Sequence, residues 1–90
     1  MTVTATFQQN PRTAGRVIDG TAFVVTPHDN RLHTLNGTGT FVWSLAEGPV
    51  TLDDVARAIA ARYEVDAARA RSDAETFLGD LTSRGILVQR

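Results

Sequence analysis

The chain changes its hydrophobic pattern once, at Asn36. Before this residue, short runs rich in β-branched and aromatic residues are separated by turn-forming residues, as in an antiparallel sheet. After it, apolar residues recur at intervals of three and four, which is the spacing of amphipathic helices. Within only 90 residues, this order predicts one α+β domain in which a sheet is followed by helices.

The part before Asn36 predicts three strands, which cover residues 16–18, 21–26 and 31–35. The dipeptide Asp19-Gly20 supplies the positive φ values of a two-residue hairpin turn. Residues 27–30, Pro-His-Asp-Asn, predict the second turn. We therefore expect a three-stranded antiparallel meander whose two outer strands have open edges.

The part after Asn36 predicts three helices, which cover residues 36–48, 51–63 and 66–84. Asn36, Thr51 and Asp66 are the expected N-caps, because their side-chain oxygens can accept an amide of the first helical turn. Gly85 is the expected left-handed stop of the last helix, and residues 86–88 follow as a terminal strand or an extended tail. The order β-β-β-α-α-α is winged helix-turn-helix-like.

Residues 1–13 are polar and lack a sustained period, so we expect a flexible N-terminal arm or an extended lead-in before a domain over residues 14–90. The first residues show neither the positive segment nor the apolar segment of a secretory signal. No run approaches the length of a membrane span. These features predict a soluble, cytoplasmic protein without a membrane partner.

The composition excludes several kinds of chemistry. All nine basic residues are arginine, and cysteine is absent, which removes lysine and thiol nucleophiles and thiolate metal sites. His28 and His33 flank Asp29, but no third ligand recurs nearby to complete a metal site. We therefore expect a protein that is not an enzyme, with no catalytic residue, no metal and no cofactor.

The charge of the third helix disfavours nucleic acid as a partner. The helix carries three arginines and four carboxylates, so its net charge is −1. The arginines are Arg69, Arg71 and Arg84, and the carboxylates are Asp66, Asp73, Glu75 and Asp80. A helix that enters a DNA groove normally faces the phosphates with basic residues. A winged-helix DNA-binding transcription regulator is therefore the weaker alternative.

The third strand, residues 31–35, is expected at an edge of the sheet. If the last helix packs beside that edge, a groove forms between strand and helix. Unpaired N–H and C=O groups of such an edge can bind an extended peptide. The other interpretation is an edge that is merely shielded by its charges and by the arm, and the physics of the residues leaves the two even.

The ordered motifs resemble those of PqqD-like proteins. Residues 35–39, Leu-Asn-Gly-Thr-Gly, together with Val42-Trp43 and Gly48, are similar to the family's "LN-x-T-G/A" signature. The second helix matches at Thr51, Val55-Ala56 and Tyr63, and the closing segment at Asp73, Phe77-Leu78, Leu81 and Gly85-Ile86-Leu87. The resemblance covers residues 16–88, which is most of the chain.

The resemblance implies a RiPP recognition element, a non-catalytic adaptor of ribosomal-peptide modification pathways. Such a domain binds the leader segment of a precursor peptide as a strand beside the third strand and presents it to a modifying enzyme, often a radical-SAM maturase. The implied peptide-binding residues are Arg31, Leu32, His33, Thr34, Arg69, Asp73, Thr76, Phe77, Asp80 and Arg84. The residues leave open which flank of the third helix faces the groove, and whether the arm or a free strand edge forms a homodimer.

Overall fold

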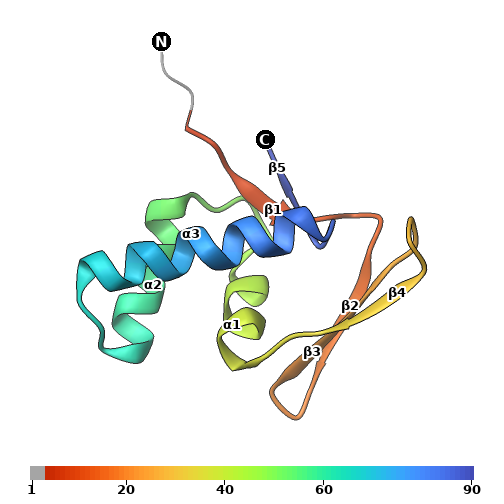
Figure 1. Ribbon diagram of the computed structural model, residues 1–90, viewed down its shortest axis with the longest axis horizontal. Helices are drawn as coiled ribbons and strands as arrows, with labels where there is room; N and C mark the ends of the chain where they lie inside the picture. Colours follow the sequence, from red (N-terminus) through yellow and green to blue (C-terminus); the bar gives the residue numbers. More distant parts are fainter. Residues whose placement is uncertain (1–3) are drawn as a thin grey trace.

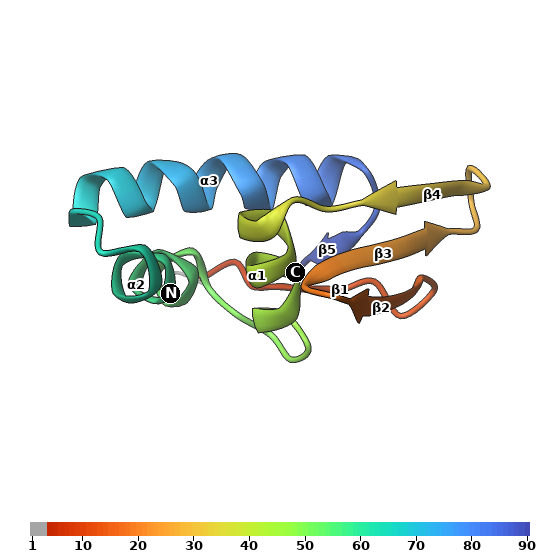
Figure 2. The same ribbon diagram turned by 90° about the horizontal axis from the view of Figure 1, so that it is seen from below.

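The computed structural model describes residues 4–90, in which three helices pack beside two small sheets (Figure 1). The larger sheet contains β2 (Ala14–Ile18), β3 (Thr21–Thr26) and β4 (Arg31–Thr34), in that spatial order and antiparallel throughout. This confirms the predicted meander, with the first strand beginning two residues earlier than expected. The sheet extends beyond the helices like a wing (Figure 2).

Both turns of the meander have the backbone that their residues predict. Asp19 and Gly20 have φ values of +51° and +78°, and Ile18 lies directly opposite Thr21, so the hairpin has a two-residue turn with positive φ at both positions. In the second turn Asn30 has a φ of +56°, a conformation that asparagine tolerates better than most residues.

The helices are α1 (Gly37–Leu45), α2 (Leu52–Tyr63) and α3 (Ala67–Ser83). All three predicted N-caps are confirmed: Asn36, Thr51 and Asp66 each accept a hydrogen bond from the backbone amide three residues later. In the described part of the chain, no helix has the length and apolar character needed to cross a membrane.

The first helix ends at Leu45, three residues before the predicted stop at Gly48. The reason lies in β1 (Phe7–Gln9), which runs past this helix end. The Gln9 amide donates to the Ala46 carbonyl at 2.8 Å, and the Gln9 side chain donates to the Trp43 carbonyl at 2.9 Å. These bonds satisfy carbonyls that a further helical turn would otherwise use.

The same strand corrects the prediction of a free N-terminal arm. β1 pairs antiparallel with β5 (Leu87–Gln89), and Phe7 exchanges backbone hydrogen bonds of 2.7 and 2.9 Å with Val50. Residues 7–9 are therefore an extended lead-in and not a flexible arm, and the folded unit begins before residue 14. Residues 1–3 of the predicted arm lie outside the described residues.

The core lies where α3 crosses α2, α1 and the base of the sheet. Its helical residues include Val42, Trp43, Val55, Ile59, Ala70, Ala74, Leu78 and Leu81. Alternate residues of β3, namely Ala22, Val24 and Thr26, are also buried, which is the pattern of a sheet covered on one face. The other face of the sheet remains exposed, so the wing offers both a face and two edges to other molecules.

Candidate functional site

The outer edge of β4 offers backbone groups for pairing. Among residues 4–90, no segment pairs with this edge of the sheet. The Leu35 amide donates to the Ala22 carbonyl at 2.9 Å, and His33 lies opposite Val24. Because backbone groups alternate in direction along a strand, Leu35 and His33 bond to β3, whereas the N–H and C=O groups of Leu32 and Thr34 point outward.

A buried hydroxyl fixes the end of this strand against α1. Thr40 accepts a hydrogen bond from the Ala22 amide at 2.9 Å and lies 3.3 Å from the Leu35 carbonyl, to which it donates. The threonine side chain thus replaces a strand partner where β4 leaves the sheet. As a result, the start of α1 follows the strand without a flexible link.

A groove of about 170 Å³ lies between this junction and α3. It is lined by Thr34, Leu35, Asn36, Gly39, Phe77, Asp80, Leu81 and Arg84. Leu35 and Leu81 are buried and Phe77 is half-buried at its floor, whereas Asn36, Asp80 and Arg84 are exposed, so the walls of the groove are polar. At the rim, the Arg84 guanidinium lies 3.2 Å from the Asp80 carboxylate, which leaves the rim without net charge.

Gly39 permits the close approach that shapes this floor. A Cβ atom at this position would lie 3.0 Å from the Asn36 side-chain oxygen and 3.7 Å from the Phe77 ring. The Asn36 oxygen is held in place because it accepts the Gly39 amide as the helix cap, at 2.7 Å. A larger residue at position 39 would therefore disturb both the cap and the groove.

The groove settles which flank of α3 faces the sheet edge. Of the residues predicted for the site, it brings together Thr34, Phe77, Asp80 and Arg84. The opposite flank of α3, with Leu78 and Thr82, instead lines a separate cavity beside Phe7 of β1.

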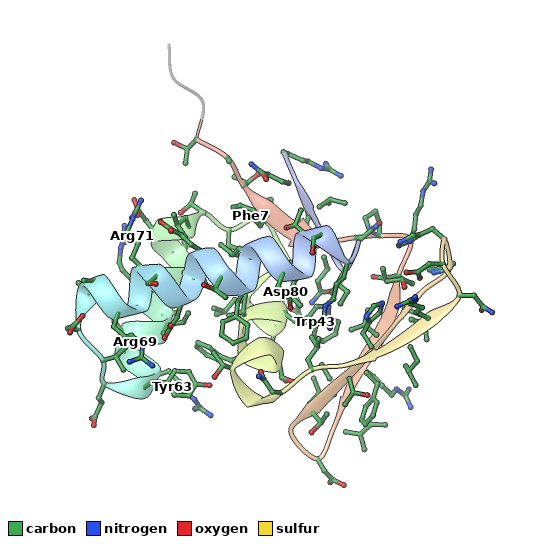
Figure 3. All side chains as sticks on the ribbon, in the orientation of Figure 1. Phe7, Trp43, Tyr63, Arg69, Arg71 and Asp80 are labelled. Atoms are coloured by element: carbon green, nitrogen blue, oxygen red, sulfur yellow. The ribbon has the colours of Figure 1, made fainter. Side chains whose placement is uncertain are left out.

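Three predicted helix residues lie outside the groove. Arg69 and Asp73 are nearer the N-terminal end of α3 and pair with each other at 3.3 Å. Figure 3 shows Arg69 near the α2 end of α3, away from Asp80. Thr76 is exposed, and its hydroxyl donates to the Ser72 carbonyl at 3.1 Å. These residues lie beyond the groove along the same helix.

The remaining predicted residues lie along β4 rather than in the groove. The Arg31 guanidinium is exposed and 3.9 Å from the Asp29 carboxylate. Leu32 is the most exposed large apolar side chain of the described residues, at 63%. His33 is half-buried on the inner face of the sheet.

The hydrogen bonds around Thr26 determine the tautomer of His33. The Thr26 hydroxyl donates to the Asp29 carboxylate, and this bond lowers the pKa of Asp29 below its ordinary value. The same oxygen lies 3.0 Å from His33 Nε2. Since the hydroxyl has a single hydrogen, Nε2 must carry a proton and donate to it. The bonds tie the second turn of the meander to the inner face of β4.

Four groove residues were not predicted as site residues: Leu35, Asn36, Gly39 and Leu81. The sequence contains a signal for Leu35, Asn36 and Gly39. These residues belong to a motif that ends an edge strand and begins a helix, and such a motif must lie beside any groove at that edge. Within residues 4–90, no group of three or more histidine or acidic side chains is placed to hold a metal ion.

Solved structures with similar folds include two peptide complexes. "TbiB1 in Complex with the TbiA(beta) Leader Peptide" has a TM-score of 0.82 and 23% identity, over 90% of this chain and 94% of that one. "Lasso peptide synthetase B1 complexed with the leader peptide" has a TM-score of 0.78 and 20% identity, over 91% and 96%.

A third similar structure is a solution NMR structure of the PqqD part of Methylobacterium extorquens PqqCD, described as a functional, stand-alone RiPP recognition element. Its TM-score is 0.71 at 19% identity, over 91% of this chain and 87% of that one. These three likenesses show the fold. Among curated proteins, none matches the sequence. The family model described as "Coenzyme PQQ synthesis protein D (PqqD)" matches residues 21–87, and the chain therefore belongs to the PqqD family.

Proposed function

We propose that this chain is a peptide adaptor that binds the leader segment of a ribosomally made precursor peptide and delivers it to a modifying enzyme, such as a radical-SAM maturase. The observation that carries the proposal is the open edge of β4, where the outward backbone groups of Leu32 and Thr34 lie next to the groove of α3. Two proteins of similar fold are complexes with leader peptides, and a third is described as a recognition element.

In this proposal the leader adds as a fourth strand beside β4. Backbone hydrogen bonds to Leu32 and Thr34 supply affinity that does not depend on sequence, as in other strand additions. One leader side chain enters the groove, whose volume of about 170 Å³ resembles the cavity of about 150 Å³ that holds a benzene ring in another protein. The Asp80–Arg84 pair at the rim carries no net charge, so the groove has no preference for a charged side chain of either sign.

The adaptor role requires no catalytic step from this chain. The enzyme acts on the core of the precursor while the adaptor holds the leader, so the adaptor must release its cargo afterwards. A dissociation constant near one micromolar, or about −8 kcal/mol, is suited to binding and release. We propose that this exchange takes place in the cytoplasm, where a precursor peptide is synthesised.

The alternative function, DNA binding through α3, receives no support from the charges of that helix. Arg69 is paired with Asp73 at 3.3 Å, and Arg84 with Asp80 at 3.2 Å. Arg71 contacts both Asp53 of α2 and its own neighbour Glu75. Each of these guanidinium groups would have to leave a carboxylate before it could contact phosphate.

The proposal is tested by titrating the labelled protein with a synthetic leader segment of a candidate precursor peptide. We expect micromolar binding and chemical-shift changes at residues 31–35 and along the groove flank of α3. A scrambled peptide of the same composition is the control and should bind more weakly. Shift changes confined to other regions would contradict the assignment of the site.

A further inference from the structure

The exposed face of the sheet carries apolar side chains up to the edge of β4. Residues that pair across antiparallel strands share a face, so Val25 shares a face with Leu32 on one side and with Ala14 on the other. Leu32 is 63% exposed and Val25 is 40% exposed. These three residues form a rung of apolar side chains, the Leu32 rung, which ends in water at the sheet edge.

The neighbouring rung on this face differs in chemistry. It contains Thr34, Phe23 and Arg16, again from the pairing of the three strands. Thr34 also lines the groove, and it lies two residues from Leu32, which is about 7 Å along a strand. One extended peptide segment is therefore long enough to meet the Leu32 rung and the groove together.

A strand added to β4 must place one side chain beside Leu32 on the exposed face. Leu32 and Thr34 direct their backbone groups toward that strand. In an antiparallel pair the residue that bonds to Leu32 has its side chain on the same face as the leucine; in a parallel pair the residue between the two that bond to Leu32 has its side chain there. A branched aliphatic or aromatic side chain there would cover the leucine, because such cross-strand pairs are favourable. A charged or small side chain would leave it in water.

We infer that Leu32 is a specificity-determining residue, which selects a branched aliphatic or aromatic side chain at one position of the leader. This inference rests on the proposed function, because it requires the leader to add beside β4. It adds a second point of side-chain recognition, on the exposed face of the sheet, to the groove on the other side of the added strand. The two points fix the register of the peptide, because a shift by one residue exchanges the faces of all its side chains.

The test selects short displayed peptides of fixed length and random sequence on the natural protein and on Leu32→Glu. Peptides selected on the natural protein should share an apolar residue at one position. On Leu32→Glu that position should change to lysine or arginine, while the position that fills the groove should keep the residues selected on the natural protein. Ile18→Glu is the matched control, since Ile18 is 49% exposed on the same face but at the opposite edge, and it should select the same peptides as the natural protein.

Affinities provide a second measurement. Leu32→Ala should weaken binding of a selected peptide about two- to fivefold, the range expected for one cross-strand pair. Alanine at the paired peptide position should cause the same loss, and the two changes together should cost no more than either alone. Thermal unfolding confirms that each variant folds; if Leu32→Glu does not, Leu32→Thr replaces it and should relax the apolar preference.

Two results would overturn the inference in distinguishable ways. If Leu32→Glu selects the same peptides as the natural protein, while Thr34→Pro still weakens their binding, Leu32 selects nothing and the proposed function stands. If no peptide is selected, or if the selected peptides bind Thr34→Pro as well as the natural protein, both the inference and the strand addition beside β4 are refuted.

Discussion

Replacing Thr34 by proline tests which edge of the sheet takes the peptide. The Thr34 amide points away from β3, since the bonds to β3 come from His33 and Leu35. Proline removes that outward donor, and it is tolerated on an edge strand when its nitrogen faces solvent. The variant should therefore keep the ladder between β3 and β4 and lose only the contact with the leader.

The size of the expected loss of affinity follows from the backbone hydrogen bonds between β4 and the added strand. One backbone hydrogen bond contributes about 0.5–1.5 kcal/mol net. The proline ring also displaces the peptide from the neighbouring bond, so two bonds, or about 1–3 kcal/mol, are lost. This corresponds to a dissociation constant about five to 150 times larger, which calorimetric titration with the leader peptide measures directly.

Val17→Pro is the matched control for this substitution. Val17 lies in the opposite edge strand β2, is 46% exposed, and directs its amide away from β3, because Ile18 pairs closely with Thr21 across the hairpin turn. It should bind the leader as the natural protein does. Normal binding by Thr34→Pro together with weakened binding by Val17→Pro would show that the peptide adds to β2 and would refute the assignment.

Three further predictions concern the scaffold that holds the site. Thr40→Val leaves a buried strand amide without its acceptor and should lower the free energy of unfolding in urea by about 1–3 kcal/mol. Gly20→Ala and Gly85→Ala should each destabilise by about 1–2 kcal/mol in the same assay, because both glycines have positive φ and the His28 ring that a Cβ at Gly85 would meet is exposed and can rotate away. The Thr51 backbone amide lowers the pKa of Asp54 in the folded state, so the stabilisation from this carboxylate is present above the ordinary value of 3.8 and is lost as the pH falls through the folded pKa. Asp54→Asn should therefore weaken the acid dependence of the free energy of unfolding, measured in unfolding curves between pH 5 and 2. An unchanged dependence would contradict the capping interaction.

The features of the fold that depend on short-range contacts were predictable from the sequence. The caps at Asn36, Thr51 and Asp66 each involve a side chain and an amide three residues away. The Asp19-Gly20 turn likewise depends only on the conformational preferences of two residues. Such signals are complete within a few residues, and all of them were confirmed.

The N-terminal strand was not predictable in the same way. Phe7–Gln9 contains three residues and pairs with Leu87–Gln89 at the other end of the chain. A segment this short has no measurable period of its own. Its structure depends on contacts with residues far away in the sequence, at Val50 and at Leu87–Gln89.

The elements that form the site were predictable, but the sequence did not show which side chains of β4 are exposed or which flank of α3 faces the groove. Leu32 and Leu35 are three residues apart, so one strand cannot bury both, and the pattern alone does not say which is exposed. The hydrogen bonds of Thr40 decide it, because they hold Leu35 at the buried junction with α1. On α3, the apolar stripe gave no preference between its two flanks, and only the packed structure brings Phe77 and Asp80 to the groove.

Amide hydrogen exchange at β4, measured with and without the leader peptide, shows which backbone groups the peptide occupies. We expect the peptide to slow exchange at Leu32 and Thr34, whose amides point to the open edge. Exchange at His33 and Leu35 should change little, because these amides already bond to β3. Protection of Gly15 and Val17 in β2 with no change at Leu32 and Thr34 would refute strand addition beside β4.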